Sequence, residues 1–211
     1  MFVAVLPVAA AGCLNKEVTE TWYLEADGAV TWTVIEKDVR SDAQAAGDRQ
    51  DEETNYIGAV RVQDHPIFRG LRQLGPVELR TRILRATVPF TVTTEAKFAN
   101  LADLGRHVIE RSGLGGTSVV ERTTDGYEWT LTMRDPHAVG ESARTNDDLN
   151  ELFNGMEHLT IMLAEGRFLT AQGFSLSSDH RNATLAGDDD RWEASDDNGP
   201  VVLKLRWKAG R

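Results

Sequence analysis

Hydrophobic and polar residues alternate along several stretches of this chain, and short turn sequences separate these stretches into pairs. The first pair lies in residues 17–39, EVTETWYLEADGAVTWTVIEKDV, where Trp22 and Trp32 hold alternating positions on either side of Asp27-Gly28. Alternation with a period of two predicts a strand with one buried face, and an Asp-Gly pair between two such runs predicts a tight turn. Residues 17–39 are therefore predicted to form a β-hairpin.

The same pattern occurs three more times and then once as a single strand. Residues 77–98 predict a second hairpin, residues 117–133 a third that turns at Asp125-Gly126, residues 157–176 a fourth that turns at Glu165-Gly166, and residues 201–207 a last strand. Short turns leave neighbouring strands antiparallel. The pattern therefore predicts an antiparallel sheet of about nine strands.

Between the hairpins, apolar residues recur every three or four positions, which is the spacing of an amphipathic helix. This spacing predicts helical segments in residues 48–63, 66–75, 100–113 and 149–156, with Asn100 as the N-cap of the third. We expect an α+β fold: an antiparallel sheet of about nine strands built from hairpins, with about three or four helices on one face. Residues 13–211 are expected to form a single domain with one hydrophobic core.

The charge of the chain restricts its partners. The net charge is -10 at pH 7, while 41% of the 211 residues are hydrophobic, as in a folded globular protein. Binding to nucleic acid needs clustered basic residues that displace counterions from phosphates. Arginines and lysines concentrate in residues 69–85 and 204–211, but there they alternate with apolar residues, as on the solvent face of a strand. Nucleic acid is therefore not an expected partner.

The first segment of the chain has the character of an export signal. Residues 2–11 are apolar, and this run is shorter than the roughly 20 residues needed to span a membrane. The run leads into Ala10-Ala11-Gly12-Cys13, which contains the only cysteine of the chain. This AAGC stretch resembles the lipobox of bacterial lipoproteins, in which small residues precede a cysteine that receives a lipid.

The resemblance implies that residues 1–12 are a signal peptide and that Cys13 becomes the lipidated N-terminus, carrying a diacylglyceryl group with fatty acids such as palmitate. It implies a protein of the bacterial cell envelope that is attached to a membrane through its lipid. Leu14 follows the cysteine in place of the Asp that usually retains lipoproteins at the inner membrane, which favours the outer membrane or the cell surface. Two other interpretations of Cys13 are a small buried hydrophobe and a catalytic thiol.

Residues that often carry catalysis are present, but they do not form a known motif. The histidines are His65, His107, His137, His158 and His180, and no His-Glu-x-x-His zinc motif joins any two of them. No serine lies in a Gly-x-Ser-x-Gly elbow. The acidic stretches 187–193 and 195–199 are expected to be solvated turns, with a calcium site as the alternative. The sequence thus predicts no catalytic residue, no metal site and no cofactor.

The tryptophans give a further indication of function. Trp22, Trp32, Trp129, Trp192 and Trp207 all fall on predicted strands or at their ends. Core packing explains such positions, and a concave apolar sheet face that holds a ligand is the alternative. Under that alternative, Trp22, Trp32 and Trp129 are the candidate ligand-facing aromatics.

Together these patterns predict a membrane-anchored envelope lipoprotein with a binding or assembly domain. Its expected partners are the membrane, through the lipid anchor, and an envelope protein or an amphiphilic ligand. An envelope hydrolase whose site assembles only in the fold is the alternative. No pattern predicts the oligomeric state.

Overall fold

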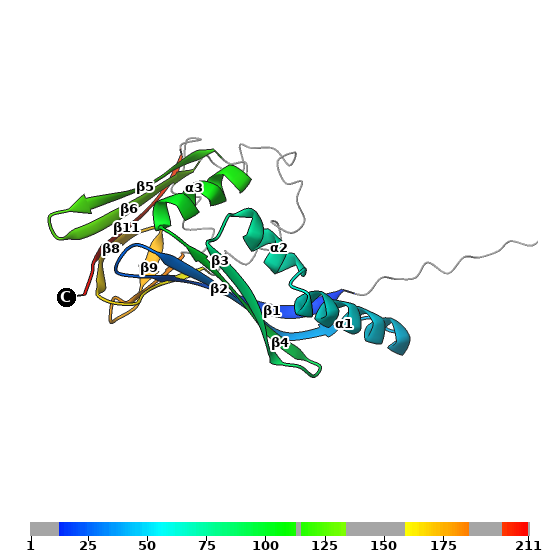
Figure 1. Ribbon diagram of the computed structural model, residues 1–211. Helices are drawn as coiled ribbons and strands as arrows, with labels where there is room; N and C mark the ends of the chain where they lie inside the picture. The colour runs from blue at the N-terminus through cyan, green and yellow to red at the C-terminus, as the bar shows by residue number, and fades with distance from the viewer. Residues whose placement is uncertain (1–12, 113–114, 134–158, 186–199, 211) are drawn as a thin grey trace, which may run out of the picture.

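The structure, a computed structural model, describes residues 13–112, 115–133, 159–185 and 200–210. Within these residues, eleven strands form a seven-stranded sheet and a four-stranded sheet. Figure 1 shows the four-stranded sheet at the end of the molecule opposite to the start of the first strand.

The seven-stranded sheet has the order β3-β4-β2-β1-β7-β10-β9. Its strands are β1 (Leu14–Leu24), β2 (Val30–Ser41), β3 (Glu78–Arg85), β4 (Phe90–Phe98), β7 (Thr160–Leu163), β9 (Phe174–Leu176) and β10 (Asn182–Leu185). The four-stranded sheet has the order β5-β6-β11-β8. Its strands are β5 (Gly116–Thr123), β6 (Gly126–Met133), β8 (Arg167–Gln172) and β11 (Val201–Lys208).

Three of the predicted hairpins are confirmed. β1 and β2 pair antiparallel around Asp27-Gly28, with Trp22 directly opposite Trp32. β3 pairs with β4, and β5 pairs with β6 across the short turn before Gly126. The predicted last strand is β11, which lies between β6 and β8. In these segments, local alternation and turn residues are sufficient to define the strands.

The predicted fold class is wrong about the number of strands and sheets and about their pairing. The described residues form eleven strands in two sheets, where about nine strands in one antiparallel sheet were expected. β1 and β7 are parallel, with Trp22 level with Ile161. The predicted fourth hairpin is also wrong, because β7 belongs to the seven-stranded sheet and β8 pairs with β11 in the other. A turn sequence such as Glu165-Gly166 indicates that the chain reverses, but not which distant strand each arm joins.

The predicted helical layer, about three or four helices on one sheet face, is wrong as well. α1 (Ala46–Arg61) and α2 (Pro66–Gln73) follow each other closely and form one bent helical segment on the seven-stranded sheet. α3 (Leu101–Ser112) packs mainly on the four-stranded sheet, and at Gly105 it approaches β5 so closely that a β-carbon would collide with Ser118. The helix predicted at 149–156 lies outside the described residues. No helix in the described part of the chain is long and apolar enough to cross a membrane.

The main hydrophobic core joins the two sheets. It contains Trp22 and Trp32 from the seven-stranded sheet, Trp129 and Leu205 from the four-stranded sheet, and Leu104 from α3. A second, smaller core lies between α1 and the seven-stranded sheet, near the start of β1. Its members are Val39, Tyr56, Ile57, Val60, Phe90 and Val92.

The close approach of β6 to β11 predicts opposite effects of the same substitution at two glycines. A β-carbon on Gly126 would lie 2.0 Å from the carbonyl oxygen of Trp207, whereas one on Gly58, in α1, would have no atom within 4 Å. We expect Gly126→Ala to lower the free energy of unfolding by about 2 kcal/mol. Gly58→Ala should raise it by about 0.5–1 kcal/mol, because alanine favours the helix. Urea unfolding measures both, and a Gly126→Ala variant as stable as the wild type would contradict the described β6–β11 packing.

Candidate functional site

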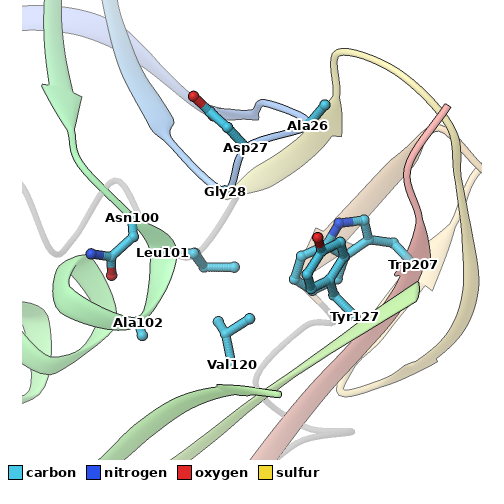
Figure 2. Close-up of a pocket in the computed structure, with 9 residues that line it drawn as sticks. All are labelled: Ala26, Asp27, Gly28, Asn100, Leu101, Ala102, Val120, Tyr127 and Trp207. Carbon is cyan, nitrogen blue, oxygen red and sulfur yellow. The ribbon is translucent and has the colours of Figure 1, made fainter. Parts of the chain in front are cut away.

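A cavity of about 270 Å³ lies where three parts of the chain meet: the β1–β2 turn, the start of α3 and the four-stranded sheet (Figure 2). Its lining residues are Ala26, Asp27, Gly28, Asn100, Leu101, Ala102, Val120, Tyr127 and Trp207. Because these residues come from remote segments, no local pattern in the sequence indicates the cavity.

Two stacked aromatic rings form one wall of the cavity. Tyr127 and Trp207 lie directly opposite each other on β6 and β11. Their ring centroids are 5.6 Å apart, with an angle of 25° between the ring planes. Figure 2 shows the side chains of Leu101 and Val120 pointing into the space between this wall and α3. The wall is held in place by packing, since Trp207 is only 3% exposed.

Two polar side chains at the cavity, those of Asp27 and Asn100, are engaged in hydrogen bonds. Asn100 caps α3, as predicted: its Oδ1 accepts a hydrogen bond from the backbone N–H of Asp103 at 2.8 Å, and its Nδ2 donates to the Asp103 carboxylate at 2.7 Å. Oδ1 of Asp27 accepts from the backbone N–H of Ala29 at 3.0 Å. The remaining lining is largely apolar and aromatic, which is the kind of surface that holds an apolar group.

One backbone hydrogen bond positions the start of α3 against the β1–β2 turn. The N–H of Leu101, the first residue of α3, donates to the carbonyl of Gly28 at 3.1 Å. Gly28 has a φ of 87°, a conformation that glycine adopts without steric cost. The Asp27-Gly28 turn thus closes the first hairpin and also defines one side of the cavity.

The structure places Trp22, Trp32 and Trp129 in the packed core, each at most 1% exposed. The ring of Trp22 lies 5.1 Å from that of Trp32 and 6.2 Å from that of Trp129, so the three residues form one aromatic cluster across the two sheets. None of the three lines the cavity. Among the described tryptophans, the residue at the cavity is Trp207. Trp192 lies outside the described residues.

A glutamate is buried beside this cluster. Glu20, two residues before Trp22 on β1, is 0% exposed. Its Oε2 accepts a hydrogen bond from Nε1 of Trp32 at 3.1 Å, and its Oε1 has no partner among the described residues. Burial raises the pKa of the Glu20 carboxyl well above its ordinary value, and the hydrogen bond from Trp32 opposes this only in part. Folding therefore shifts the protonation equilibrium of Glu20 towards the neutral form.

A second group of buried and partly buried polar side chains lies where the start of α2 meets the seven-stranded sheet. Nζ of Lys16 lies 2.7 Å from Oε1 of Glu36, and Nε2 of His65 lies 3.6 Å from Oε2 of the same carboxylate. The same His65 nitrogen is 3.1 Å from Oγ1 of Thr94. A catalytic acid or base must reach its substrate, but His65 is 0% and Glu36 1% exposed. These contacts instead fix the start of α2 to β2 and β4.

The other histidines do not assemble a catalytic or metal site in the described residues. His107 lies on α3, with its Nδ1 3.7 Å from Oε2 of Glu110, and His180 hydrogen-bonds through Nδ1 to the carbonyl of Phe168 at 3.2 Å. His137 and His158 lie outside the described residues, as do the acidic stretches 187–193 and 195–199. The described part of the chain has no group of three or more His, Cys, Asp or Glu residues that could hold a metal ion.

Cys13, the first of the described residues, is exposed. Its backbone N–H donates to Oδ1 of Asp42 at 2.6 Å, and its carbonyl accepts from the N–H of Asp42 at 3.1 Å. β1 begins at the next residue, Leu14. The interpretation of Cys13 as a buried hydrophobe is therefore wrong, whereas its lipidation stays a prediction.

No protein family model and no curated protein matches this sequence. Among solved structures, the NMR structure of the folded domain of LppM from Mycobacterium tuberculosis is similar with a TM-score of 0.35 and 10% sequence identity. The alignment covers 92% of this chain and 90% of that one. Similarity at this level does not establish a common fold, so no property of LppM is transferred to this chain.

The buried carboxyl of Glu20 predicts a pH-dependent stability. The pKa of Glu20 is higher in the folded than in the unfolded chain. Its contribution to the free energy of unfolding is therefore complete only at a pH below the pKa of an ordinary glutamate. This contribution is lost as the pH rises through the folded-state pKa. We expect Glu20→Gln, which stays neutral, to be more stable than the wild type at pH 8 and to depend less on pH.

Urea unfolding from pH 4 to pH 8 tests this expectation. The matched control is Glu17→Gln, at an exposed position on the same strand, and it should follow the wild-type pH dependence. If Glu20→Gln and Glu17→Gln give the same pH profile, then Glu20 is not the group responsible.

Proposed function

We propose that this chain is a lipid-anchored protein of the bacterial cell envelope whose domain binds an apolar group of an envelope protein or an amphiphile. The observation that carries the proposal is the exposure of Cys13 directly before β1, at the end of an AAGC stretch that follows an apolar leader. Because Cys13 is exposed, its sulfur can carry a lipid without disturbing the packed core.

The chemistry of such an anchor is sufficient for stable attachment. A single acyl chain holds a protein on a membrane only marginally, whereas two or more chains hold it firmly. A diacylglyceryl group on Cys13 supplies two chains, and removal of residues 1–12 would leave the cysteine as the N-terminus. An outer-membrane or surface location is part of this proposal, since Leu14 follows the cysteine.

The cavity supports binding of an apolar group more than it supports hydrolysis. Its aromatic wall of Tyr127 and Trp207 faces Leu101 and Val120, and the described residues of its lining include no histidine, lysine or arginine. Its one carboxylate, Asp27, is engaged by the backbone of Ala29. The volume of about 270 Å³ lies below the usual range of about 300–1,000 Å³ for drug-sized ligands. We therefore infer that it receives one ring or a short acyl segment, with the rest of the ligand outside.

The anchor predicts that Cys13→Ser moves the protein from the membrane fraction to the soluble fraction, because serine cannot form the thioether to a lipid. Detergent phase partitioning and intact mass measure this change. Asn15→Ser, at a neighbouring exposed position, is the control and should stay in the membrane fraction with the mass of a lipidated chain. Equal partitioning of wild type and Cys13→Ser would disprove the anchor.

The cavity predicts different effects of one substitution at two adjacent valines of β5. Val120 points into the cavity, whereas Val119 is 45% exposed. We expect Val120→Phe to fill the cavity and to weaken binding of the apolar fluorophore N-phenyl-1-naphthylamine by roughly tenfold. A loss of this size corresponds to about one or two methylene groups of the ligand that are no longer buried. Val119→Phe should bind it as the wild type does. Fluorescence titration measures both, and equal affinity in the two variants would show that the fluorophore does not occupy this cavity.

A further inference from the structure

Two large aliphatic side chains are exposed close together at the turn between β3 and β4. Leu84 is 61% exposed and Val88 is 45% exposed, and residues 85–87 between them are exposed as well. The pairing of β3 with β4 shifts by one residue between Ile83 and Arg85, so Leu84 has no partner in the ladder. Such a bulge bends the strand and re-aims a side chain. We refer to residues 84–88 as the β3–β4 tip.

The strand registers place this tip at the same end of the sheet as Cys13. Leu14 pairs with Ser41 on β2, and Val39 on β2 pairs with Phe90 on β4. Continuing the second register by two residues brings Val88 level with Ser41, and hence with Leu14. β1 and β4 are both neighbours of β2, so two strand spacings, about 10 Å, separate the tip from the first residues of β1. Figure 1 shows the turn of β3 and β4 and the start of β1 at this common end.

We propose that the β3–β4 tip inserts Leu84 and Val88 into the lipid bilayer that holds the chain, as a second membrane contact beside the lipid on Cys13. This inference rests on the proposed lipid anchor. A lipid attached to Cys13 brings the bilayer surface to this end of the sheet, because β1 starts at the next residue and leaves no tether. The bilayer is then the nearest apolar phase to the two exposed side chains.

The charges around the tip indicate that this contact is apolar and does not depend on attraction to anionic lipids. Arg85 is exposed within the tip and can lie at the level of the head groups. However, α1 brings carboxylates to the same end: Glu53 accepts a hydrogen bond from the backbone N–H of Ser41 at 3.2 Å, and Asp48 is exposed in the first turn of α1. With both signs of charge present, salt should change the contact little.

The test places a tryptophan at the tip and measures its contact with lipid. The lipidated Val88→Trp protein is purified from membranes and reconstituted into vesicles of phosphatidylethanolamine and phosphatidylglycerol with brominated acyl chains, which quench tryptophan on contact. The matched control is Val119→Trp, because Val119 has the same 45% exposure but lies on β5 of the other sheet. Leu84→Trp is a second reporter at the tip, and thermal unfolding verifies that each variant is folded.

We expect brominated lipid to quench an additional emission component in Val88→Trp and Leu84→Trp that is absent from the wild type and from Val119→Trp. The quenching should be the same in 0.1 M and 0.5 M salt. If neither tip reporter is quenched more than Val119→Trp, the tip does not enter the bilayer. Quenching that disappears in 0.5 M salt would show an electrostatic contact and would also overturn the proposal.

The design separates this inference from the proposed anchor. If intact mass shows that Cys13 carries no lipid, the proposed function fails, and the exposed thiol is then coupled to a maleimide phospholipid in the same brominated vesicles. Quenching of the tip reporters under that synthetic anchor would support the membrane contact alone. A lipidated Cys13 without quenching at the tip would retain the proposed function and reject the contact.

Discussion

The packing of Trp22 between Trp32 and Trp129 is the contact on which the arrangement of the two sheets depends. Trp22 and Trp32 form a cross-strand pair on the seven-stranded sheet, and Trp129 reaches Trp22 from the four-stranded sheet. Each indole buries about 150–250 Å². The orientations are fixed further by hydrogen bonds, since Nε1 of Trp129 donates to Oγ of Ser118 at 3.0 Å and Nε1 of Trp32 donates to Glu20. The same contact sets the cavity, because Tyr127 lies on β6 two residues before Trp129.

Along β1 and β2, the inner face of the seven-stranded sheet changes from aromatic to polar. Near the turn it carries Trp22 and Trp32, and farther from the turn it carries Glu20, Glu36 and Lys16. Different elements of the chain pack on these two halves of the sheet face. The four-stranded sheet and α3 pack on the aromatic half, whereas the bent α1–α2 segment covers the polar half and supplies His65 to the carboxylate of Glu36. A buried ion pair contributes little net stability, so we infer that these polar contacts mainly fix the position of the helices.

The sequence predicts the local elements well because their signals are local. Alternation with Asp27-Gly28 defines the first hairpin, and Asn100 with Asp103 defines the start of α3. The same alternation also contained the signal for Glu20, which shares the inner face of β1 with Trp22 and therefore had to be buried. The period of two alone is therefore sufficient to place Glu20 on the buried face of β1.

The division into two sheets could not be predicted in this way. Alternation shows which side chains of a strand share a face, but not which strand lies next to it, and β1 finds its parallel partner β7 far along the chain. The fourth predicted hairpin is wrong for this reason.

The cavity could not be predicted for a related reason. Gly28, Leu101 and Trp207 are ordinary turn, helix and strand residues, and only the tertiary fold brings them together. The sequence indicates that the tryptophans lie on strands or at their ends. It does not show that three of them enter the core while Trp207 lines the cavity.

The long first hairpin gives the molecule two ends with different surroundings. β1 runs from Leu14 to Leu24, a length of about 33 Å at the usual rise per residue. Cys13 lies at one end, bonded through its backbone to Asp42, and the cavity lies beside the turn at the other end. Under the proposed anchor, a chain without a tether cannot fold back to bring the cavity to the bilayer. The apolar group must then reach the cavity from the aqueous side, presented by a partner protein or by an amphiphile that has left its membrane. This geometry favours a role in capture or assembly over the direct extraction of lipid from the anchoring membrane.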